Sequence, residues 1–329
     1  MMNSIVLFFR FIKENFGRFV LGLFLVVVFL FILFPFSDLN DLISSQVSKA
    51  TANRIYMQFE ELHLNPFTAT LSIDKVFVET PQTATLSVDQ LSASPSITAL
   101  IQGKPGGSFH AQGFLKGDVK IALAPTSGGK SDSKDASKID KYSVDASAQN
   151  LSLKEFKDLL NLSLPISGKL NLALQGTADI NFVEQPEGEL TVTINKFELP
   201  PSSVSLQDMG RVNLPEIKWG QVELKGKLAG GKFVIETGKI GNNKDDFYGD
   251  IKGDLGLTIQ NFGGQITPVI GSYNISLDMK ATNAFKERAK FFLSFLDGYK
   301  KEDGSSGTQY KFRIQATAMG MPPQFTPLQ

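Results

Sequence analysis

Alternation of apolar and polar residues is the feature that most constrains this chain. From about residue 56 onward, apolar side chains occupy every second position in one short run after another. The clearest runs are 71–73, 86–88, 119–123, 170–174, 190–194, 255–259, 273–279 and 310–316. Successive side chains of a strand point to opposite faces, so each run predicts a strand with one apolar face and one wet face. Such one-sided strands are typical of antiparallel sheets.

Turn residues separate these runs. A Gly-x-apolar-x-apolar pattern recurs at irregular intervals, starting at Gly117, Gly168, Gly188, Gly220 and Gly271. The irregular spacing excludes a fixed-period solenoid and fits successive hairpins instead. The fold class predicted is therefore mainly β: a long antiparallel, twisted sheet, trough or sandwich-like. Roughly a dozen strands at about 4.8 Å spacing would make it about 55–60 Å long.

A second feature is an apolar run near the N-terminus. Every residue from 19 to 36 is apolar, Gly or Pro, which is about 27 Å of helix and close to the hydrocarbon thickness of a bilayer. A cleaved signal peptide would have a shorter apolar region and a small-residue cleavage site. We therefore expect a transmembrane helix over 19–36. Its anchoring residues include Phe19, Leu25, Val28, Phe31 and Phe34.

The flanking charges orient this helix. Arg10, Lys13 and Arg18 precede it, whereas Asp38 and Asp41 follow it. Positive residues favour the cytoplasmic side. Residues 1–18 are thus expected to form a basic cytoplasmic tail, with the bulk of the chain across the membrane.

Three further segments interrupt the strands. Residues 37–55 have apolar positions at helical spacing and predict an amphipathic helix, lying at the membrane surface or covering one end of the sheet. Residues 126–140 are rich in Ser, Gly, Lys and Asp and predict a flexible linker or loop between two β regions, 56–125 and 141–329. A helix is expected near 283–297. The sequence leaves open whether the two β regions form one sheet or two.

Composition excludes several classes of function. Lys plus Arg and Asp plus Glu both number 33, so the chain lacks the basic surplus of a nucleic-acid-binding protein. Cys is absent, and the two histidines, His63 and His110, are too far apart to form a zinc motif. We expect His63 on the wet face of a strand. With no acid–base pair to nominate, we predict no enzyme, no catalytic residue, no cofactor and no metal site.

The apolar face of such a sheet must be covered or used. Packing on a second layer would close it, whereas a curled trough with an open apolar face would accept acyl chains. Alternation alone does not choose between these. The residues expected to line an apolar groove are Val119, Ile121, Leu170, Leu172, Leu174, Val192, Ile194, Leu255, Leu257, Ile275 and Leu277.

The order of features resembles a known family. An anchor ending in Phe34-Pro35-Phe36 precedes the amphipathic helix, then Leu62-x-Leu64-x-Pro66, then many Gly-started strands. The chain closes with the alternating strand 310–316 and Met321-Pro322. This order resembles the type II secretion system protein N family, in its anchored form with a long periplasmic region, within the wider AsmA-like group. The closing strand departs from that family, because Ala316-Thr317-Ala318 stands where Gly-Thr-Leu is typical.

The resemblance implies a location and two functions. The chain would sit in the bacterial inner membrane, with the N-terminus in the cytoplasm and most residues in the periplasm of a Gram-negative envelope. It would be a non-enzymatic component of a type II protein secretion system, with secretion-system subunits as partners. The AsmA-like kinship implies instead a β-groove that binds phospholipid or transfers it between envelope membranes.

Overall fold

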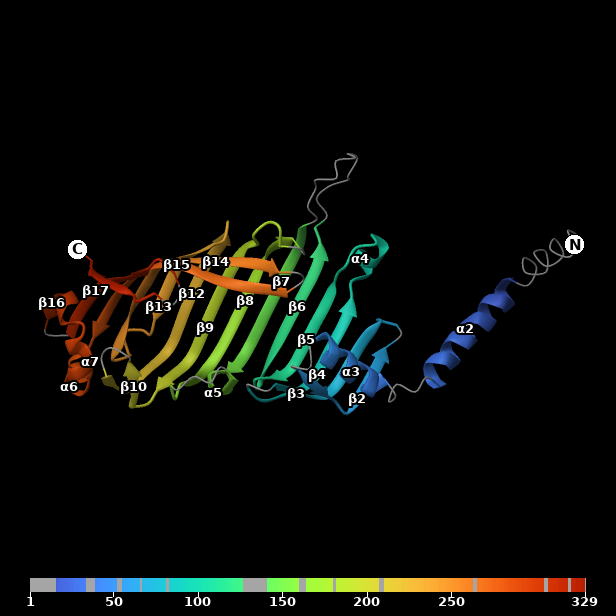
Figure 1. Cartoon of the computed structure of the whole chain (residues 1–329), viewed down its shortest axis with the longest axis horizontal. Coiled ribbons are helices and arrows are strands. Elements are labelled where there is room, and N and C mark those ends of the chain that lie inside the picture. The colour runs from blue at the N-terminus through green and yellow to red at the C-terminus, as the bar shows by residue number, and fades with distance from the viewer. Residues whose placement is uncertain are drawn as a thin grey trace, which may run out of the picture.

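The computed structural model is dominated by one long antiparallel sheet (Figure 1). It describes residues 16–33, 39–51, 55–65, 67–80, 83–126, 141–159, 164–179, 182–206, 210–262, 265–304, 307–318 and 321–328. The predicted fold class is confirmed in its main part, since the chain is mainly β and its sheet is antiparallel.

Two helices precede the sheet: α2 (Phe16–Leu33) and α3 (Leu39–Ala50). The first half of the sheet and its helices are β1 (Tyr56–Gln58), β2 (Glu61–Asn65), β3 (Thr70–Thr80), β4 (Thr83–Pro95), α4 (Ile97–Ile101), β5 (Gly107–Phe114), β6 (Gly117–Pro125), β7 (Lys141–Ser152), α5 (Leu153–Leu159) and β8 (Ser167–Asp179). The second half comprises β9 (Glu187–Leu199), β10 (Ser202–Leu206), β11 (Gly210–Leu214), β12 (Ile217–Ala229), β13 (Lys232–Ile240), β14 (Phe247–Phe262), β15 (Gln265–Ala281), α6 (Asn283–Arg288), α7 (Lys290–Ser294), η2 (Asp297–Tyr299), β16 (Lys300–Gly304), β17 (Gly307–Ala316) and β18 (Gln324–Pro327).

Strands follow one another across the sheet almost in chain order. The path runs β1-β3-β4-β5-β6-β7-β8-β9-β12-β13-β14-β15-β17-β16, with β2 beside β3 and β18 beside β17, and β10 and β11 form a separate pair. Fourteen strands lie on this path, so the sheet extends roughly 62 Å at about 4.8 Å per spacing. Strands β6 and β7 pair directly, so the β regions before and after residues 126–140 belong to one sheet.

The pairing registers place apolar residues on one face throughout. Directly opposed residues of neighbouring strands point to the same side of a sheet. One row of such partners runs from Val119 on β6 through Ala148, Leu172 and Val192 to Leu224 on β12. The opposite face carries charged pairs between strands, such as Lys232–Asp254 at 3.0 Å and Lys311–Asp278 at 3.2 Å. The sheet therefore has one apolar and one charged face.

Short helices cover one margin of the apolar face. Leu153 of α5 packs with Leu115, Leu151 and Leu170, and all four are buried. Further along the chain, Phe285 of α6 belongs to a larger buried cluster on the last strands of the sheet. In Figure 1 these helices lie along the lower margin of the sheet. A third buried cluster, of Val76, Val88 and Ala111, lies on β3, β4 and β5. The core thus consists of separate buried clusters rather than one filled layer over the whole face.

The helix predicted near 283–297 is not continuous. The structure has α6, then α7, then the 3-10 turn η2, with a break at Ala289 (φ −114°, ψ 21°). Phe285, Ala289 and Leu293 are all buried, whereas Phe291 is 56% exposed. Such short helical turns are stabilised by tertiary packing rather than by helix propensity, so the backbone bends to follow the sheet.

The N-terminal helices match the predicted positions in part. Helix α3 ends at Ala50, and residues 37–38 and 52–54 of the predicted amphipathic helix lie outside the described residues. Helix α2 contains Phe19, Leu25, Val28 and Phe31, whereas Phe34 and residues 1–15 also lie outside them. Within the described part of the chain, no helix is long and apolar enough to cross a membrane. The span over 19–36 therefore stays a prediction.

Candidate functional site

An apolar pocket lies on this face at the C-terminal end of the sheet. Its volume is about 540 Å³, within the range of small-molecule sites. None of the described residues that line it is charged. They are Leu214, Trp219, Ile240, Phe247, Leu277, Met279, Phe292, Phe295, Leu296, Tyr299, Phe312, Ile314 and Phe325.

The floor of the pocket comes from strands and its roof from the broken helix. Trp219, Ile240 and Leu277 project from β12, β13 and β15, whereas Phe292 belongs to α7 and Tyr299 to η2. The bend at Ala289 therefore has a structural consequence, because it brings the aromatic residues of the roof over the sheet. Phe295 and Phe325 are 44% and 45% exposed, so the pocket is open to solvent beside them.

Polar contacts outside the pocket hold its roof in place. The Thr282 hydroxyl accepts a hydrogen bond from the Phe285 amide and caps α6. The Arg288 guanidinium binds the Asp246 carboxylate at 2.6 Å and lies 5.1 Å from the centre of the Phe285 ring. Phe285 in turn stacks on Phe247, with ring centroids 4.9 Å apart. Helix α6 is thus fixed to the end of β14.

The indole N–H of the single tryptophan, Trp219, is hydrogen-bonded to the backbone and is therefore not available to a ligand in the pocket. Trp219 Nε1 donates a hydrogen bond to the Phe247 carbonyl, and the indole stacks on Phe197 at 4.9 Å. Trp219 is half-buried, and because its indole N–H is already hydrogen-bonded, it presents mainly its ring to a ligand. The arrangement therefore suits an apolar chain, and Tyr299 has the one hydroxyl among the described lining residues.

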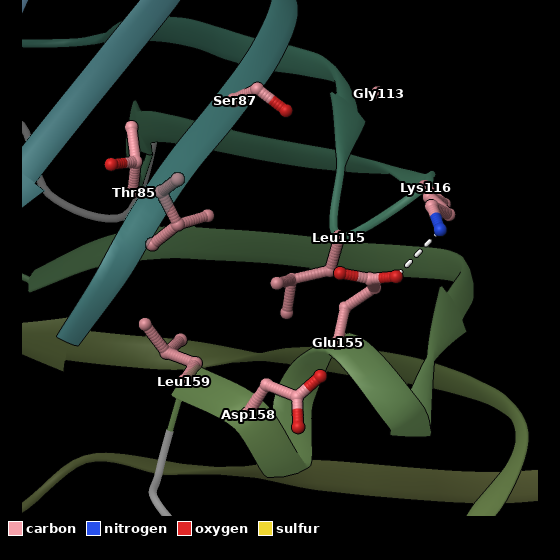
Figure 2. A pocket seen from close by; sticks show the side chains of 9 residues that line it. Thr85, Ser87, Gly113, Leu115, Lys116, Glu155, Asp158 and Leu159 are labelled. Atoms are coloured by element: carbon pink, nitrogen blue, oxygen red, sulfur yellow. Dashed lines mark hydrogen bonds and ion pairs between the residues drawn. The ribbon is translucent and has the colours of Figure 1, made fainter.

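A second pocket, shown in Figure 2, has a different character. It measures only about 90 Å³ and lies where α5 meets the sheet, between Leu115 and Leu159. Lys116 and Glu155 form an ion pair across it at 2.6 Å (Figure 2). Its volume is below that of ordinary ligand sites. We interpret this pocket as a packing gap beside the ion pair that attaches α5 to the turn between β5 and β6.

The predicted groove residues project from the same apolar face as the large pocket. Leu170 is buried, Ile121 is 42% exposed, and the others are intermediate. The registers join them strand by strand, from Val119 and Ile121 on β6 to Ile275 and Leu277 on β15. Of the predicted set, only Leu277 lines the 540 Å³ pocket. The structure thus assembles the predicted row and adds an aromatic pocket at its end.

The aromatic lining escaped sequence reasoning. Alternation reveals strands, but Phe292, Phe295 and Tyr299 lie on helical turns and Phe325 lies on a short edge strand. One signal was present: Phe recurs between residues 285 and 325 at positions 285, 291, 292, 295, 312 and 325. Such a density of aromatic residues in a segment that is only partly strand points to an aromatic cluster.

The long hairpin β14–β15 borders the opposite margin of the face. Gly256 and Gly271 oppose each other at a register shift, where a Cβ on Gly256 would lie 3.4 Å from the Gly271 Cα. Beyond this point the Leu257 amide donates to the Gly231 carbonyl in the β12–β13 turn, at 2.8 Å. Figure 1 shows the distal part of the hairpin, in orange, passing in front of the neighbouring strands.

Comparison of the chain with protein-family models, with curated proteins and with solved structures finds no match. The resemblance to the type II secretion system protein N family and to the AsmA-like group therefore stays a prediction.

Proposed function

We propose that this chain is a membrane-anchored β-trough protein that binds phospholipid through its acyl chains. The observation that carries the proposal is the continuous apolar face, which leads into an apolar pocket of about 540 Å³. An acyl chain needs a long, uncharged surface, and its removal from water stabilises binding in proportion to the area buried. A charged headgroup would remain outside, because burying it without partners is costly.

The partial exposure of the face supports an open trough. Phe109 and Ile121 are 39% and 42% exposed, and most of the row between the covering helices is half-buried. In a closed sandwich these positions would be as fully buried as Leu170, which is only 8% exposed in this structure. Contiguous exposed apolar surface of this kind marks a binding site for lipid, ligand or protein.

The membrane anchor and location belong to the same proposal. Leu21, Phe24 and Phe29 of α2 are each 58% exposed, so more than half of their apolar surface is left uncovered by the described residues. Residues 19–33 alone make about 22 Å of helix, and the apolar run continues in the sequence to residue 36. We infer a single span in a bacterial inner membrane, with the trough in the periplasm.

The secretion role remains the second candidate. A component of a type II secretion system would use the trough as a scaffold and recruit other subunits, for instance by strand addition at a sheet edge. A tightly closed core with a prominent edge strand would favour that role. The half-exposed apolar face favours lipid instead, so we place lipid binding first.

Photocrosslinking tests this proposal. The full chain would be reconstituted in vesicles containing a phospholipid with a photoactivatable acyl chain, irradiated, digested and mapped by mass spectrometry. We expect labelled peptides from β6 to β15 in addition to α2. Label restricted to α2 would contradict the proposal, because it would mean that lipid contacts only the anchor.

A further inference from the structure

Three side chains with metal-binding atoms meet on the charged face at the N-terminal end of the sheet. Glu61 and His63 are two residues apart on β2, so both point away from the apolar face that carries Leu62. Asp74 lies directly opposite Glu61 on β3. Within the described residues, this is the only such group of three or more potential ligands.

The distances match those of a metal centre. His63 Nε2 lies 3.1 Å from Glu61 Oε2 and 3.3 Å from Asp74 Oδ2, and the three ligand atoms are all within 4.8 Å of one another. Ligand atoms about 2.1 Å from a tetrahedral zinc ion lie about 3.4 Å apart. The two distances from the imidazole are thus nearly those that one shared ion requires, and the two carboxylate oxygens lie within 4.8 Å of each other.

A neighbouring residue orients one of the acidic ligands. Gln90 Nε2 on β4 donates to Asp74 Oδ1 at 2.7 Å, which turns Oδ2 toward His63. Outer hydrogen bonds of this kind orient metal ligands. The adjacent Lys75 pairs with Glu60, a carboxylate outside the group, at 2.6 Å. Its ammonium is also close enough to interact electrostatically with Glu61 and Asp74, and these acidic groups together raise the pKa of Lys75.

We propose that Glu61, His63 and Asp74 form a zinc-binding site. One nitrogen and two carboxylate oxygens are donors that Zn²⁺ accepts, and three protein ligands leave a fourth position for water or an exogenous ligand. The side chains of His63 and Glu61 are 57% and 68% exposed, so an ion can reach them directly. The site lies away from the apolar face and does not depend on lipid binding. Sequence reasoning missed it because the third ligand comes from the next strand.

Zinc titration of the full chain in detergent, after removal of metal with a chelator, tests the site. The ion used is Zn²⁺ alone, followed by calorimetry, and Co²⁺ absorption reports the coordination geometry. We expect one zinc per chain, and a loss of affinity on the order of tenfold or more in His63→Ala and Glu61→Gln. Zinc affinity in His110→Ala should equal that of the unchanged chain, because among the described residues His110 pairs with one carboxylate, that of Asp118 at 3.9 Å, and belongs to no group of three potential ligands.

Two results would overturn the proposal. One is the absence of stoichiometric zinc binding by the unchanged chain. The other is equal affinity in His63→Ala and His110→Ala, which would place zinc elsewhere. Circular dichroism checks that each variant folds. None of the three substitutions should disturb folding, because Glu61 and His63 are exposed and His110 is half-buried.

Discussion

The side-chain amide of Gln185 forms two hydrogen bonds with the backbone of Ile259, 74 residues further along the chain. The Ile259 amide donates to Gln185 Oε1 at 2.8 Å, and Gln185 Nε2 donates to the Ile259 carbonyl at 3.0 Å. Gln185 precedes β9, and Ile259 lies in the distal half of β14. One side chain therefore takes the place of a strand partner and fastens the long hairpin to the turn between β8 and β9.

Replacing Gln185 should loosen the distal hairpin without unfolding the sheet. In Gln185→Ala both hydrogen bonds are lost, each contributing about 0.5–1.5 kcal/mol. We expect faster amide hydrogen exchange around Ile259, with thermal stability of the sheet nearly unchanged. The matched control is Gln175→Ala, which removes an exposed bond to Asp145. Equal exchange at Ile259 in both variants would show that Gln185 does not hold the hairpin.

Charges placed on the apolar face should act differently at covered and open positions. Leu170 is 8% exposed under α5, so Leu170→Asp buries an unpaired charge, at about 3–5 kcal/mol, and should unfold the chain. Ile121 is 42% exposed, so Ile121→Asp should fold normally and lower the yield of lipid crosslinks. Thermal melting and crosslink yield measure the two effects.

The control for this pair lies on the opposite face. Lys120 neighbours Ile121 and points to the charged side of β6, so Lys120→Ala should change neither folding nor crosslinking. Unfolding of Ile121→Asp comparable to that of Leu170→Asp would mean that the face is closed, and the trough would be excluded.

Strand periodicity predicted the sheet well because it is a local property. Residues such as Leu170, Leu172 and Leu174 alternate wherever one face is apolar, and each hairpin pairs neighbours in the chain. The side of each predicted groove residue followed from the same alternation, whereas the phase shifts at Lys75, Asn150 and Lys196, which have positive φ, did not. The shape of the covering helices α5, α6 and α7 could not be predicted from alternation, because it depends on contacts between segments that are distant in the sequence.

Three features illustrate that limit. The break at Ala289 arises where α6 and α7 pack on the sheet, although the apolar stripe of 283–297 resembles one straight helix. The Gln185–Ile259 contact joins segments that share no sequence signal. Zinc ligands escaped notice because Asp74 faces Glu61 only once β2 and β3 pair.

The ring of Phe247 should contribute strongly to the stability of the pocket. It stacks on Phe285 at 4.9 Å and meets Phe292 edge-on at 6.4 Å. We expect Phe247→Ala to lower the free energy of unfolding by about 3–5 kcal/mol, measured by urea denaturation. Phe325 is 45% exposed at the rim, and Phe325→Ala should cost much less. A similar loss of unfolding free energy in Phe247→Ala and Phe325→Ala would contradict the placement of Phe247 inside the pocket and Phe325 at its rim.

Membrane topology can be tested independently of lipid binding. Because Arg10, Lys13 and Arg18 precede the apolar run, we expect a reporter fused after Gln329 to be active only outside the cytoplasm. The reporter is an enzyme that gains activity only outside the cytoplasm, and the matched control carries it on a chain that lacks residues 1–36, which should be inactive. An inactive full-chain fusion, with the fusion protein present at full length, would overturn the proposed orientation.

The most direct test of lipid binding uses Trp219, which is the only tryptophan in the chain and lines the apolar pocket. The full chain in detergent would be titrated with phospholipid brominated on its acyl chains, with the unbrominated lipid as control. Bromine quenches indole fluorescence only at short range. The account predicts saturable quenching of Trp219 by the brominated lipid alone, and weaker quenching in Leu277→Glu. Unchanged Trp219 fluorescence at saturating lipid would contradict an acyl chain in the pocket.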